Sequence, residues 1–290
     1  MQRTRRGRAA FVGLATVDLI YEVEHCARPN EKINARSQQM YAGGPATNAA
    51  VTFAHLGGEA ALAAAVGRHP LGRVIHAELE RMGIALCDLH PEFDGLPALS
   101  SVMVDAQGQR AVVSANAGRI GASRTEADSA LCAWADVVEV DGHQMEACVE
   151  WARCAQSLGK PVVLDGGSWK QGSEALLAHV HTAICSADFH PPGCATEEDV
   201  VAYLRSRGVG QIAISHGAHA LRFWCEEERG EVLPPQVEAV DTTGAGDILH
   251  GAYCLYAAMG KSFRESLTEA AGVAAHSCQT RGTRAWMEER

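Results

Sequence analysis

Short apolar runs alternate with amphipathic segments through the second half of the chain, from Gly121 onward. Each run has the length of a buried strand, and the segments between them repeat apolar residues at helical spacing. Buried strands alternating with helices are typical of a parallel sheet covered on both faces. We therefore predict an α/β fold of three layers, with a central, mainly parallel sheet and helices on both faces. The strands are expected at residues 135–142, 161–167, 181–187 and 211–217, and helices at 147–159 and 197–208.

The first half of the chain predicts the same sheet and a second, smaller one. A buried strand at residues 9–13 delivers Asp18 to a following loop or strand, and a helix at 46–57 ends at a glycine. Two runs with alternating polarity, at about 32–43 and 98–117, are typical of a small antiparallel sheet exposed on one face. Because no linker or internal repeat interrupts the chain, we predict a single domain over residues 1–290.

Composition excludes several classes of partner. The chain has 290 residues and a net charge of -10, which argues against duplex nucleic acid and anionic membranes, because both attract clustered Lys and Arg. No apolar run reaches the roughly 18 residues that a spanning helix needs. The ten cysteines are scattered and form no C-x-x-C pair, as expected in a reducing compartment. We therefore expect a cytoplasmic protein.

A glycine-rich turn, Asp241–Asp247 ("DTTGAGD"), precedes a strongly apolar segment near the end of the chain. Loops at the carboxyl ends of parallel strands converge on one edge of a sheet, where ligands bind. Gly244 and Gly246 would let backbone N–H groups at a helix start approach an anion. A carboxylate such as Asp247 is useful there if it takes a proton from a hydroxyl that attacks a phosphate. A plain helix cap by Asp241 or Asp247 remains the alternative.

Three motifs together resemble the ribokinase, or PfkB, family of carbohydrate kinases. The turn "DTTGAGD" is similar to the family's second signature throughout, and "AGGPATNAAVTFAHLG" at residues 42–57 is similar to its first. The segment "VGLATVDLIYEV" at residues 12–23 resembles the N-terminal strand that bears a substrate-binding Asp. The motifs occur in the expected order over about 240 residues. The resemblance implies a ribokinase-like fold in which the two alternating runs form a small β-lid.

The same resemblance implies ATP-dependent phosphorylation of a sugar hydroxyl. Asp247 would be the general base, and the backbone of Gly244, Ala245 and Gly246 would be the anion hole. The sugar hydroxyls would be held by Asp18, Gly43, Gly44 and Asn48. From the residues alone, Asn48 could instead cap a helix, and the two glycines could form a simple strand-to-helix turn.

Further sites also follow from the resemblance. The nucleotide contacts would be Ser215, Gly217, Thr242, Gly244 and Gly246. Lys170 would contact a phosphate unless it is an ordinary surface lysine. Asp241 and the late segment at 277–285 resemble the parts of a monovalent cation site, which implies K⁺. The family's N-x-x-E motif, which helps to organise Mg²⁺, corresponds to "SADF" at 186–189, where the Glu is replaced by Phe. Asp188 would then act on Mg²⁺ through water.

Three functions remain open at this point. The first is a sugar kinase, with the β-lid also forming a homodimer as it does in many members of the family. The second is a nucleoside kinase, because the same family includes these enzymes. The third is a non-catalytic sugar or nucleotide sensor, which the altered "SADF" segment favours and the intact Asp247 opposes. The fold class alone does not choose among acceptor sugars.

Overall fold

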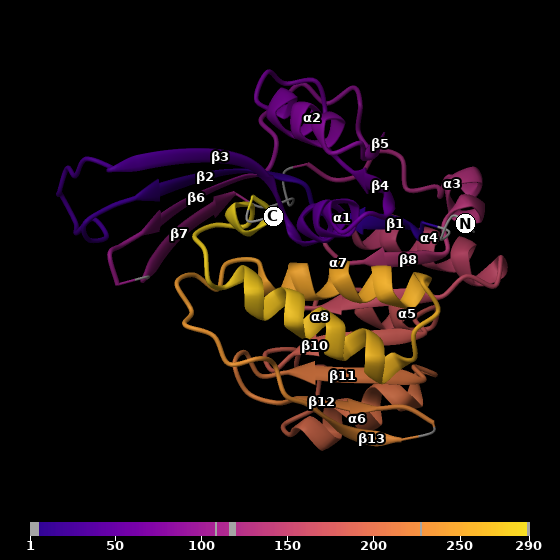
Figure 1. Ribbon diagram of the computed structural model, residues 1–290. Helices are drawn as coiled ribbons and strands as arrows, with labels where there is room; N and C mark the ends of the chain where they lie inside the picture. Colours follow the sequence, from indigo (N-terminus) through magenta and orange to yellow (C-terminus); the bar gives the residue numbers. More distant parts are fainter. Residues whose placement is uncertain (1–5, 108, 116–119, 227, 289–290) are drawn as a thin grey trace, which may run out of the picture.

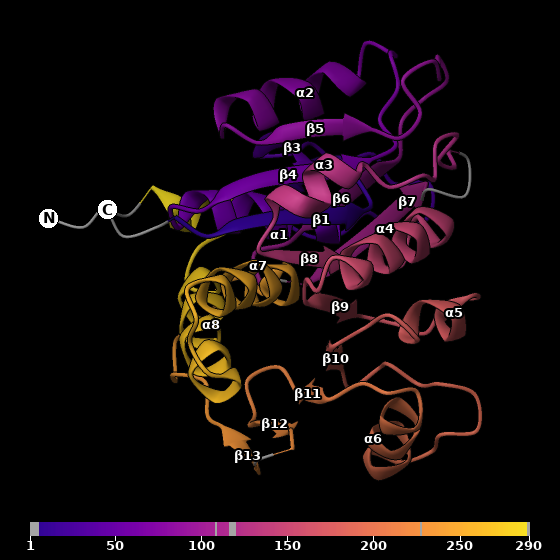
Figure 2. The same ribbon diagram turned by 90° about the vertical axis from the view of Figure 1, so that its right-hand side faces the viewer.

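The protein consists of a three-layer body and a projecting sheet, shown in a computed structural model that describes residues 6–107, 109–115, 120–226 and 228–288 (Figure 1). The central layer is a twisted sheet, and helices cover both of its faces (Figure 2). This arrangement confirms the predicted α/β fold with a central, mainly parallel sheet.

Within the described residues, nine strands form the central sheet in the order β13-β12-β11-β10-β9-β8-β1-β4-β5. All neighbouring pairs from β5 to β11 are parallel, and only β12 and β13 run antiparallel to their neighbours. The four runs predicted from Gly121 onward are β8, β9, β10 and β11. The strands are β1 (Arg8–Gly13), β4 (Glu59–Ala64), β5 (Ala85–Asp88), β8 (Val137–Val140), β9 (Val162–Gly166), β10 (Thr182–Ser186), β11 (Gln211–Ser215), β12 (Leu221–Trp224) and β13 (Arg229–Val232).

The two faces of the sheet bury separate apolar clusters. One cluster contains residues of α1 (Pro45–His55), α2 (Gly72–Arg81), α7 (Ala245–Ala258) and α8 (Phe263–Ser277). The other contains residues of α3 (Ser129–Trp134), α4 (Met145–Ser157), α5 (Ser173–Leu177) and α6 (Glu197–Ser206). A short 3₁₀ helix, η2 (Ala285–Met287), follows α8. Among the described residues, no helix has both the length and the apolar character needed to cross a bilayer.

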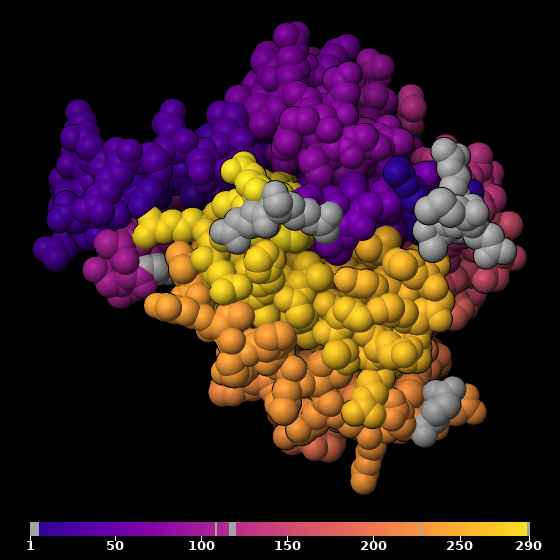
Figure 3. Space-filling model, in the orientation of Figure 1, coloured from indigo at the N-terminus to yellow at the C-terminus, as the bar shows by residue number. Residues whose placement is uncertain are grey.

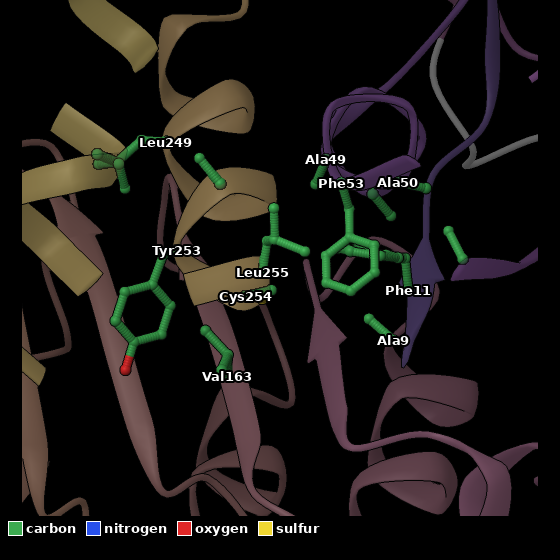
Figure 4. Close-up of a cluster of buried hydrophobic side chains, with 14 of the residues drawn as sticks. Ala9, Phe11, Ala49, Ala50, Phe53, Val163, Leu249, Tyr253, Cys254 and Leu255 are labelled. Atoms are coloured by element: carbon green, nitrogen blue, oxygen red, sulfur yellow. The ribbon is translucent and has the colours of Figure 1, made fainter. Parts of the chain in front are cut away.

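Helices α1 and α7 pack side by side on β1 and its neighbours. Phe53 of α1 lies 5.6 Å from Phe11 of β1 in an edge-to-face contact, and Leu255 of α7 lies beside this pair (Figure 4). Leu249, Tyr253 and Cys254 continue the buried side of α7 (Figure 4). This packing fixes the start of α7 at the carboxyl edge of the sheet.

The projecting sheet is the predicted β-lid, with one strand that sequence analysis did not include. Its described strands have the order β3-β2-β6-β7, and they are β2 (Thr16–Glu22), β3 (Ser37–Gly43), β6 (Leu99–Val104) and β7 (Arg110–Ala115) (Figure 1). The lid therefore has three chain segments rather than two, because β2 pairs with both β3 and β6. The β2–β6 pair is parallel, so the lid is a mixed sheet and the prediction of an antiparallel one is wrong in this respect. The first expected segment begins at 32, but its strand begins at Ser37. Residues 116–117 of the second lie outside the described residues.

Gly251 allows the close contact between α1 and α7. A Cβ atom on Gly251 would lie 2.3 Å from the Ala49 carbonyl oxygen and 2.9 Å from the Thr52 Cβ, so Gly251→Ala must push the helices apart. We expect the free energy of unfolding to fall by about 1–3 kcal/mol. Chemical denaturation measures this change.

Gly272, in the middle of α8, provides the matched control for that substitution. A Cβ atom there would meet no atom within 4 Å. We expect Gly272→Ala to raise the free energy of unfolding by about 0.5–1 kcal/mol, because alanine favours the helical backbone. Equal losses of stability in both variants would contradict the proposed role of Gly251.

Candidate active site

The turn before α7 is held in place by the Asp241 side chain. Its Oδ1 accepts hydrogen bonds from the Thr243 N–H at 2.9 Å and the Thr243 hydroxyl at 2.7 Å. Its Oδ2 accepts a hydrogen bond from the Gly282 N–H at 2.9 Å. Asp241 therefore fastens the turn to the segment after α8. It does not cap α7, whose N-cap residue is Gly244.

The start of α7 carries no side-chain cap, in contrast to α6 and α8. Thr196 and Ser262 each form a capping box that satisfies N–H groups at the starts of α6 and α8. At α7, Gly244 is in the left-handed conformation with φ 70° and makes no side-chain cap hydrogen bond. The Ala245 N–H donates to the Thr242 carbonyl at a long 3.3 Å. N–H groups in the first turn of a helix lack helical partners and can bind an anion.

Asp247 lies in this first turn and contacts Asn48 of α1. The Asn48 Nδ2 donates to the Asp247 Oδ2 at 2.7 Å, across 199 residues of sequence. Asn48 lies inside α1, whose N-cap is Gly44 and which has no side-chain cap, so the alternative of a helix cap at Asn48 is wrong. Residues from the two motifs therefore meet in one site.

Burial and nearby carboxylates raise the pKa of Asp247 to about 7. Burial is the largest cause, and Asp165 is the next; Asp141 also raises the pKa. The hydrogen bond from Asn48 and the charge of His250 lower it. A carboxyl group with a pKa near neutral can accept a proton from a hydroxyl more readily than an ordinary aspartate can. The environment of Asp247 therefore suits a general base.

Asp18 and Gly43 lie together at the base of the lid. The Thr16 hydroxyl donates to the Asp18 Oδ1 at 2.6 Å, and burial raises the pKa of Asp18. A Cβ atom on Gly43 would lie 1.8 Å from the Asp18 Oδ2, so any side chain at position 43 would displace the Asp18 carboxylate. Glycine at this position is required by that contact, and the polar group it makes room for suits a sugar hydroxyl.

Gly44 continues from Gly43 into α1 and also has no room for a side chain. It has φ 96°, and a Cβ atom there would lie 2.3 Å from the Leu14 carbonyl oxygen. Asp141, at the end of β8, accepts hydrogen bonds from the Leu14 N–H at 2.8 Å and the Ala46 N–H at 3.2 Å. The strand-to-helix turn is therefore real, and Asp141 ties the start of α1 to the segment that follows β1. Asp141 was not predicted as a site residue, although its position after a buried strand is a usable signal.

Asp165 and His250 lie behind Asp247, between the sheet and α7. The His250 Nδ1 lies 2.7 Å from the Gly246 carbonyl oxygen, and the Nε2 lies 3.0 Å from the Ile184 carbonyl oxygen. The Asp165 Oδ2 is 3.6 Å from the His250 Nδ1. His250 therefore ties the first turn of α7 to the sheet.

A cavity of about 200 Å³ opens beside the start of α7. Ser215, Gly217, Thr242 and Gly246 line it, and most of the remaining lining side chains are Ala, Val, Leu and Pro. Four of the five predicted nucleotide contacts therefore line one mostly apolar cavity, which suits the flat face of a base, whereas Gly244 is not part of its lining. The apolar lining from α8 was not predicted, because an alanine-rich helix face has the same pattern whether it borders a core or a cavity.

The remaining candidate residues lie on loops at the same edge of the sheet. The Lys170 Nζ donates to the Ser168 carbonyl at 3.3 Å. Asp188 is exposed, whereas Phe189, in the place of the expected Glu, is 2% exposed and packs against Trp169 at 5.6 Å. A buried phenylalanine cannot replace a carboxylate ligand. In the described part of the chain, no three His, Cys, Asp or Glu side chains gather as a metal-binding set.

Arg284 and Glu78 were both missed by sequence analysis. The Arg284 Nε donates to the Glu78 Oε1 at 2.6 Å, and both side chains are 7% exposed. The Arg284 Nη1 donates to the Asn48 Oδ1 at 3.0 Å. No local pattern identifies this pair, since Glu78 lies in an amphipathic helix and Arg284 lies 206 residues later.

Comparison with known proteins identifies the family of this chain. The model of the pfkB family of carbohydrate kinases matches residues 7–290. The chain is 24% identical to a ribokinase from Arabidopsis thaliana over 298 residues, which covers 96% of this chain and 78% of that protein. It is 26% identical to an aminoimidazole riboside kinase from Salmonella typhimurium over 258 residues, which covers 83% of this chain and 77% of that protein.

A solved structure confirms the fold. The structure of Arabidopsis thaliana ribokinase complexed with ribose and ATP superposes with a TM-score of 0.79 at 23% identity. The match covers 96% of this chain and 94% of that chain. The three-layer architecture and the predicted ribokinase-like fold therefore agree.

Proposed function

The chain belongs to the pfkB family of carbohydrate kinases, and we propose that it transfers the γ-phosphoryl group of ATP to a hydroxyl of a sugar with Asp247 as general base. One observation carries the catalytic assignment. Asp247, with its raised pKa, lies in the uncapped first turn of α7, next to Ala245 and Gly246, which line the cavity. Phosphoryl transfer to an alcohol needs both of these groups.

The proposed reaction begins with a sugar held between the lid and α1. Asp18, Gly43, Gly44 and Asn48 hold its hydroxyl groups, and Asp247 takes the proton from the attacking oxygen. The backbone of Gly244, Ala245 and Gly246 stabilises the negative charge on the transferring phosphoryl group. The proton ends on the Asp247 carboxylate, and ADP leaves with the β-phosphate oxygen that was bonded to the γ-phosphorus.

ATP is proposed to occupy the cavity beside α7. Ser215, Gly217 and Thr242 contact the nucleotide there, and Lys170 contacts a phosphate. Two observations support this placement: the cavity is mostly apolar away from α7, and it meets the anion-binding helix start at Gly246. The Arabidopsis thaliana ribokinase whose structure is complexed with ribose and ATP has the same fold, which supports ATP as the nucleotide.

Two cations complete the proposal. Mg²⁺ would neutralise charge on the nucleotide phosphates. The nucleotide itself would hold most of the ion's coordination sites, and Asp188 would contact the ion through water. The exposed Asp188 carboxylate fits that outer role, and Phe189 contributes no ligand. Asp241 fits a K⁺ site beside the anion hole, since its carboxylate oxygens lie where the turn and the segment after α8 meet.

The single kinase domain over residues 1–290 is also proposed to be a cytoplasmic homodimer that associates through the lid. Met40 of β3 and Val112 and Val113 of β7 support this interface, because they are 45%, 56% and 72% exposed. The ten cysteines are all free, as expected in a reducing compartment.

The raised pKa of Asp247 predicts the pH dependence of catalysis. A base acts only when it is ionised, so kcat/KM should fall about tenfold per pH unit below the pKa of the free enzyme, which is about 7. The measurement is kcat/KM for the acceptor sugar from about pH 5 to about pH 9. A profile that stays flat on the acid side would exclude Asp247 as a base with this pKa.

A nucleoside kinase is the second candidate function, and its support is the similarity to the aminoimidazole riboside kinase. Coupled ADP release across pentoses, ketohexoses, keto-deoxy acids and nucleosides, with Mg²⁺-ATP and with or without K⁺, decides between the two. We expect turnover on a sugar class. Turnover on nucleosides alone would establish the second candidate. No turnover on any acceptor, with ligand-induced thermal shifts intact, would favour a non-catalytic sensor.

A further inference from the structure

Arg284 is a buried cation at the junction of three parts of the molecule. It lies directly before η2, in the C-terminal segment that packs where the lid joins the body (Figure 3). Its side chain is 7% exposed. Its donors reach Asn48 in α1, Glu78 in α2 and the Ala42 carbonyl near the end of β3. A buried guanidinium is costly unless its charge and its N–H groups have partners.

The partners of Arg284 are a carboxylate, an amide oxygen and backbone carbonyls. The Nε donates to the Glu78 Oε1 at 2.6 Å, and the Nη2 donates to the Ala42 carbonyl at 2.6 Å. The Nη1 donates to the Asn48 Oδ1 at 3.0 Å and to the Thr283 carbonyl at 3.2 Å. The second oxygen of Glu78 accepts the Ala42 N–H at 2.6 Å. Arg284 is therefore neutralised and held rigidly by its surroundings.

The contact with Asn48 determines which way the Asn48 amide faces. An amide presents an oxygen acceptor on one side and an NH₂ donor on the other. With its oxygen toward Arg284, the Asn48 NH₂ group faces Asp247 and donates to Oδ2 at 2.7 Å. The flipped amide would place two donors against each other at Arg284 and two acceptors against each other at Asp247. Only one orientation satisfies both neighbours.

We propose that Arg284 is a positioning residue, which fixes the Asn48 amide so that its NH₂ group donates to the Asp247 carboxylate. This inference rests on the proposed function, because it concerns the proposed base. Arg284 acts through Asn48 rather than on the reacting atoms. Glu78 in turn holds Arg284, so a pair of residues outside the two sequence motifs sets the geometry of the site.

Loss of this orientation should change the proton affinity of Asp247. The hydrogen bond from Asn48 lowers the pKa of Asp247, and its removal raises that pKa further. The other groups that face Asp247 are Asp165 from β9, Asp141 after β8, Glu139 from β8 and His250 from α7. Burial raises the pKa of Glu139 well above its ordinary value. None of these four groups contacts Arg284 through a described hydrogen bond, so they remain constant when Arg284 is replaced.

The test compares pH profiles of kcat/KM for wild type, Arg284→Met and Arg284→Lys. Methionine keeps an apolar chain of similar length and removes every donor. We expect the acid limb of its pH profile to move to higher pH by about one unit and kcat/KM at neutral pH to fall about fivefold. Lysine keeps a cation that can donate to the Asn48 oxygen, so its acid limb should lie closer to that of wild type. Arg264→Met is the matched control, because Arg264 is exposed on α8 and pairs with Glu228 at 3.6 Å.

A double-mutant cycle separates positioning from general support of the fold. If Arg284 acts through Asn48, then adding Arg284→Met to Asn48→Ala should shift the acid limb little further. Additive shifts would mean that Arg284 acts independently of Asn48. An unshifted acid limb in Arg284→Met would overturn the proposal outright. If Arg284→Met does not fold, the double variant Arg284→Met/Glu78→Gln replaces it, because it leaves no unpaired buried charge. An unshifted acid limb in that double variant would overturn the proposal.

Failure of this inference differs from failure of the proposed function. If Asp247→Asn keeps the wild-type rate, Asp247 is not the base and the proposed mechanism is wrong. If Asp247→Asn is inactive while Arg284→Met keeps the wild-type acid limb, only the positioning role of Arg284 is wrong. A selective rise of KM for anionic sugars, without a pH shift, would instead make Arg284 a binding residue.

Discussion

Asp247→Asn is expected to lower kcat by about 10²- to 10⁴-fold, because it removes a general base and little else. Asparagine has nearly the same shape as aspartate, so the packing of the first turn of α7 should remain. The substituted side chain can still rotate its oxygen toward the Asn48 Nδ2, which lies 2.7 Å from the Asp247 Oδ2. We therefore expect thermal stability and ligand affinity to stay close to wild type while turnover is lost. Steady-state ADP release measures the rate.

Ligand affinity provides the internal control for that experiment. Titration calorimetry with ATP and with the acceptor sugar should give dissociation constants similar to those of wild type. If affinity and turnover were lost together, the substitution would have damaged the site as a whole. If turnover stayed near the wild-type rate, Asp247 would not be the base.

Gly246→Val is expected to lower both ATP affinity and turnover, by about 10²-fold or more in kcat/KM. A Cβ atom at Gly246 would meet no protein atom within 4 Å, so the substitution should not disturb the fold. Gly246 lines the nucleotide cavity at the uncapped start of α7, and a branched side chain there would occupy the space of a phosphate group. A loss of ATP affinity in Gly246→Val would therefore report on nucleotide binding and not on unfolding of the protein.

Gly246→Ala is the graded control, since its single methyl group occupies less of the same space. We expect its ATP affinity to lie between those of wild type and Gly246→Val. The thermal unfolding midpoint should be unchanged in both variants. An ATP affinity that is unchanged in Gly246→Val would show that phosphate does not approach the backbone at this position.

The central sheet could be predicted because its strands are buried on both faces. The strands β8 and β9 are apolar up to Asp141 and Asp165 except for Glu139, and each is followed by an amphipathic helix or a glycine turn. The missing lid strand, β2, has no such signal. Only two residues separate it from β1, and most of its side chains are half-buried. Its pairing with β6, from Val17 opposite Leu99 onward, depends on a contact between distant segments.

The candidate site could be located because short motifs carry it. Gly244, Gly246 and Asp247 belong to one motif, and Gly43, Gly44 and Asn48 belong to another. The partners that position them come from elsewhere in the chain. Glu78 has the same local surroundings in sequence as the exposed Glu80, and only the tertiary structure turns it toward Arg284.

Mass spectrometry of the acceptor sugar after incubation with the protein and Mg²⁺-ATP tests whether the site transfers phosphate to the sugar. We expect the sugar to gain one phosphate in step with the ADP formed, and Asp247→Asn to leave the sugar unmodified. ADP formed together with inorganic phosphate and an unmodified sugar would contradict that expectation. That outcome would mean that the site hydrolyses ATP and does not activate the sugar hydroxyl.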